Sequence, residues 1–332
     1  MPTKFGVIVP QGWRLDLTHI ADPQEKYAHM TAYAREAERL KFESIWLYDH
    51  FHTVPTQELE TTFECWISTA ALARDTSTVR IGQMVTCNNY RPPSLLAKMA
   101  STVDVLSGGR LDFGIGAGWY EEEFKAYGYD YPDGPERLRM LDEAMQVIKA
   151  MWTEKRATFE GKYYSVNGAI NEPKGVQKPH IPMWVAGGGE KVTLRLVAKY
   201  GDACNIGVGA SIDPAQFRHK YEVLRGHCEN LGRDYNSIIK SGEMTIHMRL
   251  PGQSAKDAAA TTLRNYSRAH NREYTFEELS ASHYIGTVQE TTDLMGGLVD
   301  AGTEYIIVYL NDLARMETMQ LFAEEVMPAF TS

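Results

Sequence analysis

The chain has 332 residues, of which 43% are apolar and 23% are charged, and its 43 acidic and 34 basic side chains give a formal net charge of −9. This composition is too apolar for a disordered chain, and an acidic balance argues against a general nucleic-acid binder, which neutralises phosphates with excess Lys and Arg. No apolar run approaches the roughly 18 residues that cross a bilayer, and the opening apolar stretch is too short for a signal peptide. We therefore expect a cytoplasmic protein of enzyme size with no membrane partner.

Short apolar strands alternate with amphipathic helices along the whole chain. The first half predicts strands at Lys4–Val9, Ser44–Tyr48, Val79–Thr86 and Arg110–Ile115, and helices at Gln24–Leu40, Thr61–Arg74, Pro93–Leu106 and Arg137–Trp152. The second half predicts strands at Met183–Ala186, Asp202–Ile206, Ile238–Met248 and Glu304–Leu310, and helices at Glu190–Tyr200, Pro214–Leu231, Val288–Ala301 and Leu313–Val326. Buried strands that alternate with helices are typical of a parallel sheet with helices outside it.

Eight strand-plus-helix units favour a closed (β/α)8 TIM barrel over an open sheet. We expect one domain over residues 1–332, with extra segments at Trp119–Glu136, Glu154–Pro182 and Pro251–Gly286. A hairpin is predicted inside the second segment, at Thr158–Val166. The first and third segments follow strands directly, which places them at the C-terminal face, where barrel active sites are built.

Asp49 and His50 come directly after the second predicted strand. Histidine is the side chain whose proton moves near neutral pH, and an adjacent carboxylate can orient it or anchor a ligand. The alternative is that Asp49 caps a loop and His50 is simply half-buried. The position at the rim of a barrel makes a functional pair as plausible as this structural one.

Two glycine-rich turns follow predicted strands. In Gly114–Trp119 the spacing is a poor match to a dinucleotide fingerprint, so the turn either admits a ligand close to the backbone or only permits tight packing. Gly187, Gly188 and Gly189 precede a predicted helix, where exposed N–H groups and the helix dipole favour a phosphate. Without the GK[ST] ending of a P-loop, ATP hydrolysis is not implied.

Other reactive side chains carry weaker signals. Cys87 has no recognisable partner histidine, so we expect a buried structural thiol. The acidic run Glu121–Glu123 is interpreted as a solvated face, and the histidines show no metal-ligand spacing, so no metal is expected. A phosphate-bearing cofactor across the barrel mouth fits these residues better than a metal site does.

Four segments, in order along the chain, resemble the bacterial-luciferase-like flavin and deazaflavin oxidoreductases. They are KFGVIVPQ, WLYDHF, SGGRLDFGIGAGWYEEEFKAYG, and PMWVAGGG followed by GDACNIG. The Asp-His pair after a strand is more similar to the coenzyme F420 branch of this family than to its FMN branch.

The resemblance implies a TIM barrel with F420, or alternatively FMN, at its C-terminal mouth. Asp49 and His50 match a pair beside the cofactor ring, with His50 as the candidate catalytic group that handles a proton. Met84-Val85 matches a non-prolyl cis peptide behind the ring. The matched cofactor-binding turns are Gly116, Ala117 and Gly118 near the side chain of the cofactor, and Gly187, Gly188 and Gly189 at its phosphate.

One position departs from the family. Its sugar-phosphate dehydrogenases carry a catalytic Glu where this chain has Trp119, which puts sugar-phosphate oxidation in doubt and favours an apolar or aromatic substrate. Trp13, Trp119 and Tyr90, with Trp46, are candidates to line the substrate pocket, although any one of them could equally be core.

The resemblance implies an F420-dependent oxidoreductase that transfers a hydride between the deazaflavin C5 and a small organic substrate. The alternatives are an FMN-dependent two-component monooxygenase that uses reduced flavin and O2, and a carrier protein that has kept the barrel without its chemistry. Family relatives also suggest a homodimer, with contacts through the second and third helices.

Overall fold

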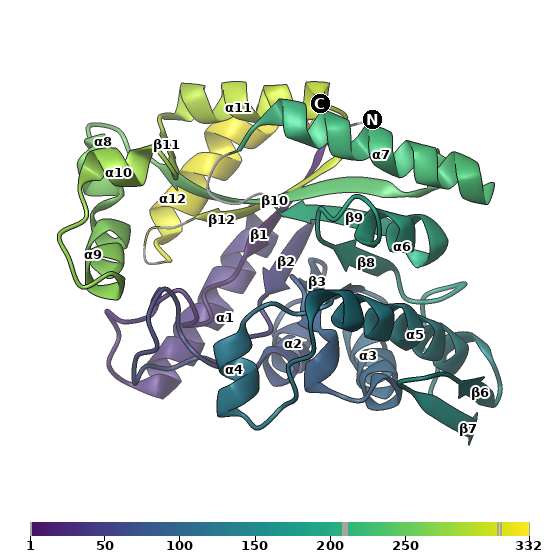
Figure 1. Ribbon diagram of the computed structural model, residues 1–332. Coiled ribbons are helices and arrows are strands. Elements are labelled where there is room, and N and C mark those ends of the chain that lie inside the picture. Colours follow the sequence, from purple (N-terminus) through teal and green to yellow (C-terminus); the bar gives the residue numbers. More distant parts are fainter. Residues whose placement is uncertain (1, 208–211, 311, 313, 332) are drawn as a thin grey trace.

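Eight parallel strands form a closed barrel in the computed structural model, which describes residues 2–207, 212–310, 312 and 314–331 (Figure 1). They pair in the order β12-β1-β2-β3-β5-β8-β9-β10, and β10 pairs with β12 to close the ring. The barrel strands are β1 (Lys4–Ile8), β2 (Ser44–Leu47), β3 (Arg80–Gln83), β5 (Leu111–Gly116), β8 (Met183–Ala186), β9 (Ala203–Gly207), β10 (Ile239–Met248) and β12 (Tyr305–Leu310). The predicted TIM barrel is confirmed.

Helices cover the outside of the barrel, mostly where the apolar periodicity placed them. They are α1 (Pro23–Arg39), α2 (Cys65–Asp75), α3 (Pro93–Ser107), α5 (Gly134–Thr153), α6 (Thr193–Tyr200), α7 (Pro214–Leu231), α11 (Val288–Asp300) and α12 (Met316–Leu321). Helix α2 begins later than predicted because Glu64, expected inside its first turn, is the N-cap and accepts the Ile67 N–H at 2.6 Å. After α12 the chain continues into a π-helical turn, η3 (Phe322–Val326).

The extra segments hold short elements. The first contains α4 (Glu121–Ala126), and the second contains the predicted hairpin, made of antiparallel β6 (Ala157–Glu160) and β7 (Ser165–Ala169). The third contains α8 (Ala255–Ala258), α9 (Ala260–Ala269), α10 (Phe276–Ser280) and β11 (Tyr284–Gly286), a group that projects from one side of the barrel in Figure 1. Strand β11, which pairs with β10, was not predicted because three residues are too few to show a period.

Large aromatic side chains fill the inside of the barrel. Trp46 and Trp184 lie edge to face with ring centroids 4.8 Å apart, and Tyr305 packs against Trp184 at 5.0 Å. A Cβ on Gly82 would lie only 2.4 Å from the Trp46 ring, so these rings depend on small neighbours in the adjacent strands. The interior is therefore a packed core, and space for a ligand remains at the C-terminal ends of the strands.

Along the described ranges, no helix combines the length and the apolar character needed to cross a membrane.

A carboxylate outside the barrel gives a stability prediction. Glu38 near the end of α1 accepts hydrogen bonds from the N–H groups of Ser77 (2.8 Å) and Val79 (3.0 Å), just before β3. Burial would raise the pKa of Glu38, but the backbone N–H groups of Thr78, Val79 and Ser77 outweigh burial and lower it to about 2. Because the folded pKa lies below the unfolded value of about 4.5, this stabilisation is present above pH 4.5 and is lost as the pH falls towards 2.

We predict that Glu38→Gln lowers the free energy of unfolding by about 1 kcal/mol at pH 7, since one charge-assisted acceptor becomes neutral at a partly exposed site. The difference from the parent should shrink between pH 4.5 and pH 2 in urea titrations. The exposed Glu222→Gln is the control, and a difference that stayed constant with pH would contradict the assignment.

Candidate active site

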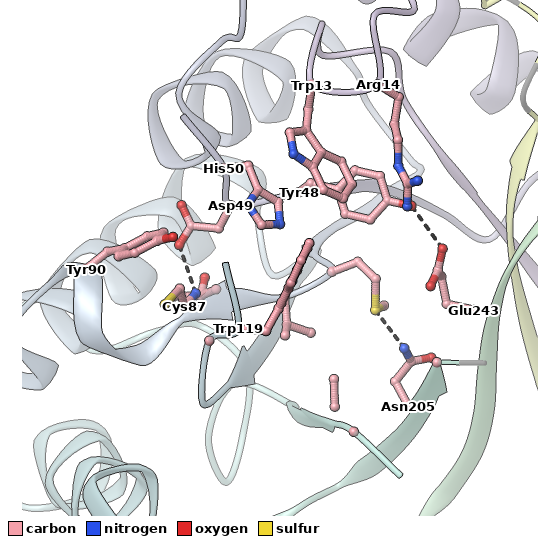
Figure 2. A pocket seen from close by; sticks show the side chains of 17 residues that line it. Trp13, Arg14, Tyr48, Asp49, His50, Cys87, Tyr90, Trp119, Asn205 and Glu243 are labelled. Atoms are coloured by element: carbon pink, nitrogen blue, oxygen red, sulfur yellow. Dashed lines mark hydrogen bonds between the residues drawn. The ribbon is translucent and has the colours of Figure 1, made fainter. Parts of the chain in front are cut away.

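A cavity of about 290 Å³ opens at the C-terminal ends of the barrel strands (Figure 2). This volume is near the lower end of the roughly 300–1,000 Å³ typical of ligand sites. Its lining residues are Trp13, Arg14, Tyr48, Asp49, His50, Met84, Val85, Thr86, Cys87, Tyr90, Gly118, Trp119, Ala186, Gly187, Asn205, Gly207 and Glu243. They include Asp49 and His50 of the predicted pair, and three of the aromatic side chains predicted for the substrate pocket, Trp13, Tyr90 and Trp119.

The strand predicted at Val79–Thr86 is interrupted inside the cavity wall. It divides into β3 and the two-residue β4 (Thr86–Cys87), and the peptide bond between Met84 and Val85 is cis. Asn205 of β9 contacts this break, with its amide nitrogen 2.9 Å from the Met84 sulfur. The non-prolyl cis peptide expected at this position is therefore present, and both of its residues line the cavity.

Asp49 is held in place by its neighbours. Its carboxylate accepts two hydrogen bonds from Arg91, at 2.7 and 3.0 Å, and one from the backbone N–H of Cys87 at 2.9 Å. Arg91 also pairs with Glu64 at the start of α2. Asp49 thus ties the end of β2 to the segment after β4, and it faces the cavity as a buried, paired anion.

His50 presents its imidazole ring to the cavity between aromatic side chains. The ring stacks on Trp13 with centroids 4.1 Å apart and planes only 5° from parallel, and Trp119 approaches its edge at 5.7 Å. Nδ1 lies 2.8 Å from Oε2 of Glu123. Among the described residues, Nε2 makes no hydrogen bond, so this nitrogen remains for a ligand.

Glu123 corrects the interpretation of the acidic run Glu121–Glu123 as a solvated face. Glu121 and Glu122 are exposed, but Glu123 is completely buried beneath the first turn of α4. Burial alone would raise the pKa of Glu123, but the hydrogen bond from His50, helped by donors from His52 and Tyr90, lowers it. The carboxylate is therefore ionised at neutral pH, and it belongs to the site.

A second charged group lies on the other side of Trp13. The Arg14 guanidinium lies over the Trp13 ring at 4.4 Å, and the Tyr48 hydroxyl donates to Glu243 at 2.9 Å (Figure 2). Burial raises the pKa of Glu243, although Arg14 and Tyr48 oppose this rise. This side of the cavity therefore offers both a guanidinium and a carboxyl group to a polar ligand.

The first glycine turn is packed against the cavity wall. Gly118 lines the cavity with a φ of +76°, and a Cβ there would lie 2.6 Å from the Cys87 sulfur. Gly116 ends β5, and Ala117 packs on the core; neither lines the cavity. Cys87 itself is buried, and burial together with the nearby Asp49 raises its thiol pKa, which fits the expected unreactive thiol.

The second glycine turn is only partly in the cavity wall. Gly187 lines it with a φ of +121°, whereas Gly188 and Gly189 lie beyond the lining. Helix α6 begins at Thr193, not at the predicted Glu190, and no side chain of the described residues caps its start. Glu190 pairs instead with Lys220, at 2.6 Å.

The predicted pocket and the observed cavity differ in further residues. Trp46, proposed for the pocket, is buried in the barrel interior. Arg14, Tyr48, Asn205 and Glu243 line the cavity but were not identified. A polar side chain inside an otherwise apolar strand, such as Asn205 in β9, is the signal that could have located one of them.

The luciferase-like monooxygenase family matches residues 3–303 of the chain. An F420-dependent glucose-6-phosphate dehydrogenase from Kineococcus radiotolerans is 27% identical over 318 residues, which cover 89% of this chain and 91% of the relative. An FMNH2-dependent dimethylsulfone monooxygenase from Pseudomonas putida is 32% identical over 265 residues, which cover 71% of this chain and 70% of the relative.

The barrel also matches solved structures over its whole length. An F420-dependent secondary alcohol dehydrogenase, solved in complex with an F420-acetone adduct, superposes with a TM-score of 0.81 at 21% identity and covers 100% of both chains. At this identity the likeness concerns the fold. The family match over residues 3–303 shows that the chain belongs to the luciferase-like monooxygenase family.

Proposed function

We propose that this protein is a coenzyme F420-dependent oxidoreductase that transfers a hydride between the deazaflavin C5 and a small organic substrate. The observation that carries the proposal is the imidazole of His50, which borders the cavity. Its Nδ1 contacts a buried carboxylate, and its Nε2 makes no hydrogen bond to any residue that the structure describes. Interconversion of an alcohol and a carbonyl compound moves a proton as well as a hydride, so the site needs such an acid–base group.

The residues present fit a planar, phosphate-bearing cofactor. The cis Met84-Val85 bond and Asn205 form one part of the cavity wall, and Gly187 and Gly118 bring backbone close to it without a side chain. The backbone N–H groups of Gly188 and Gly189 precede a helix start without a side-chain cap, which suits a phosphate. When bound, the deazaflavin would supply the hydride chemistry.

Other residues of the cavity orient the reacting groups. Trp13 holds the imidazole plane by stacking, and the Asp49–Arg91 pair fixes the loop that carries His50. Trp119 is 60% exposed, so its ring stands at the open side of the cavity, where a substrate could cover it. An exposed aromatic ring at this position supports an apolar or aromatic substrate over a sugar phosphate.

The second candidate is an FMN-dependent two-component monooxygenase that uses reduced flavin and O2. It is supported by the similarity to the dimethylsulfone monooxygenase, which at 32% is the more identical of the two relatives described above. The wider coverage by the F420-dependent relative, at 89% of this chain, supports F420.

We further propose that residues 1–332 act as one barrel domain in a cytoplasmic homodimer. Exposed apolar side chains on α2 and α3, Ile67 (72% exposed) and Leu95 (51%), support a contact there, which light scattering would test against the chain mass of 37.4 kDa.

Absorbance titrations with F420 and with FMN test the cofactor. We predict saturable F420 binding, weakened about tenfold by Gly187→Ala because φ of +121° strains any side chain. Gly226→Ala, in open space on α7, is the matched control and should bind like the parent. Tight binding of FMN with no binding of F420 would contradict the proposal and support the monooxygenase.

Replacement of His50 tests the chemistry. We predict that His50→Ala lowers kcat by about 10²–10⁴ with little change in F420 affinity, because proton transfer is lost while the cofactor contacts remain. His180→Asn, outside the cavity lining, is the control. Unchanged turnover in His50→Ala would favour a cofactor carrier or another acid–base group.

A further inference from the structure

Glu123 joins four hydrogen-bond donors at one buried point. Its Oε1 accepts the backbone N–H groups of Phe51 (2.7 Å) and His52 (2.8 Å), and its Oε2 lies 2.7 Å from the Tyr90 hydroxyl and 2.8 Å from Nδ1 of His50. These contacts run from α4 back to the loop after β2 and to the segment after β4. A carboxylate with this many partners has one fixed orientation.

The charge state of Glu123 determines which atoms carry protons. The hydrogen bonds from His50, His52 and Tyr90 outweigh burial and lower the pKa of the carboxyl group, so it is an acceptor at neutral pH. Burial, with the neighbouring Cys87 and Glu123, raises the pKa of Tyr90, so its hydroxyl stays a donor. A contact of 2.8 Å between this carboxylate and Nδ1 then requires a proton on Nδ1.

We propose that Glu123 is a positioning residue that keeps the neutral imidazole of His50 in its Nδ1–H form, with Nε2 unprotonated towards the cavity. The catalytic consequence of this proposal rests on the proposed function. The tautomer itself does not, because it follows from contacts within the chain.

The stack on Trp13 also hinders rotation of the His50 ring out of this arrangement. A ring flip that exchanged the two nitrogens would have to pass through orientations that break the contact at 4.1 Å and 5°. Trp119 and Tyr120 close two further sides of the ring, with centroids at 5.7 and 5.9 Å. Packing and hydrogen bonding therefore select the same orientation.

In the direction of alcohol oxidation, the substrate O–H bond breaks and its proton goes to Nε2 of His50. The C–H bond would break with both electrons as the C=O bond forms, and the deazaflavin, when bound, would accept the hydride. His50 becomes an imidazolium ion whose charge is opposed by Glu123 at 2.8 Å. Carbonyl reduction reverses each step, and in it the imidazolium returns the Nε2 proton to the developing alkoxide.

Glu123→Gln is an informative test because the backbone donors determine the orientation of the introduced amide. The N–H groups of Phe51 and His52 require an acceptor at the Oε1 position, so the amide oxygen occupies it. The amide NH2 then faces Nδ1 of His50, which must become an acceptor. The proton therefore moves to Nε2, the wrong nitrogen for accepting a proton from a substrate.

Long-range ¹H–¹⁵N NMR of ¹⁵N-histidine-labelled protein reads the tautomer without cofactor or substrate, with His50→Asn used to assign the signals. We expect Nδ1–H in the parent and in Glu122→Gln, the exposed neighbour on α4, and Nε2–H in Glu123→Gln. Glu123→Gln should also lower kcat for F420-coupled alcohol oxidation by about 10²–10⁴ without raising KM.

A parent protein with the Nε2–H form, or a folded Glu123→Gln that keeps Nδ1–H or full kcat, would overturn the proposal. If Glu123→Gln fails to fold, the spectrum of the parent decides alone. If the tautomers are as expected but the protein shows no turnover with F420, the missing turnover contradicts the proposed function. The role of Glu123 is then still supported.

Discussion

The tight packing of aromatic rings inside the barrel is the constraint on which the rest of the site depends. Trp46, Trp184 and Tyr305 fill the interior, and adjacent strand glycines such as Gly82 make room for them. With this core filled, ligand space is left at the C-terminal mouth, among the loops that follow the strands. The chemistry of the protein is therefore determined by what those loops bring together.

Two buried carboxylates organise those loops. Asp49 holds the backbone of Cys87 and the guanidinium of Arg91, and Glu123 holds the loop of Phe51 and His52. Asp49 accepts one backbone N–H and Glu123 accepts two, in each case from a segment distant in sequence, so each joins separate parts of the mouth. His50 lies between these two anchors, which explains how an imidazole on a loop can have a defined orientation.

Much of the fold and part of the site could be predicted from the sequence, for identifiable reasons. Long helices such as α1 and α7 and apolar strands such as β12 carry strong periodicity, and His50 and Gly187 follow strands at the barrel mouth. Glu123 could not be placed in this way, because a helix of six residues shows no reliable period. Its burial depends on tertiary contacts with His50 and Tyr90, which no local pattern encodes.

A crystal structure of the protein with oxidised F420 would test the central claim most directly. Our account predicts the deazaflavin ring in the cavity, against the cis Met84-Val85 bond, with C5 on the side of His50 Nε2 and the phosphate near Gly188 and Gly189. A ring bound outside this cavity, or one with C5 turned away from His50, would contradict it.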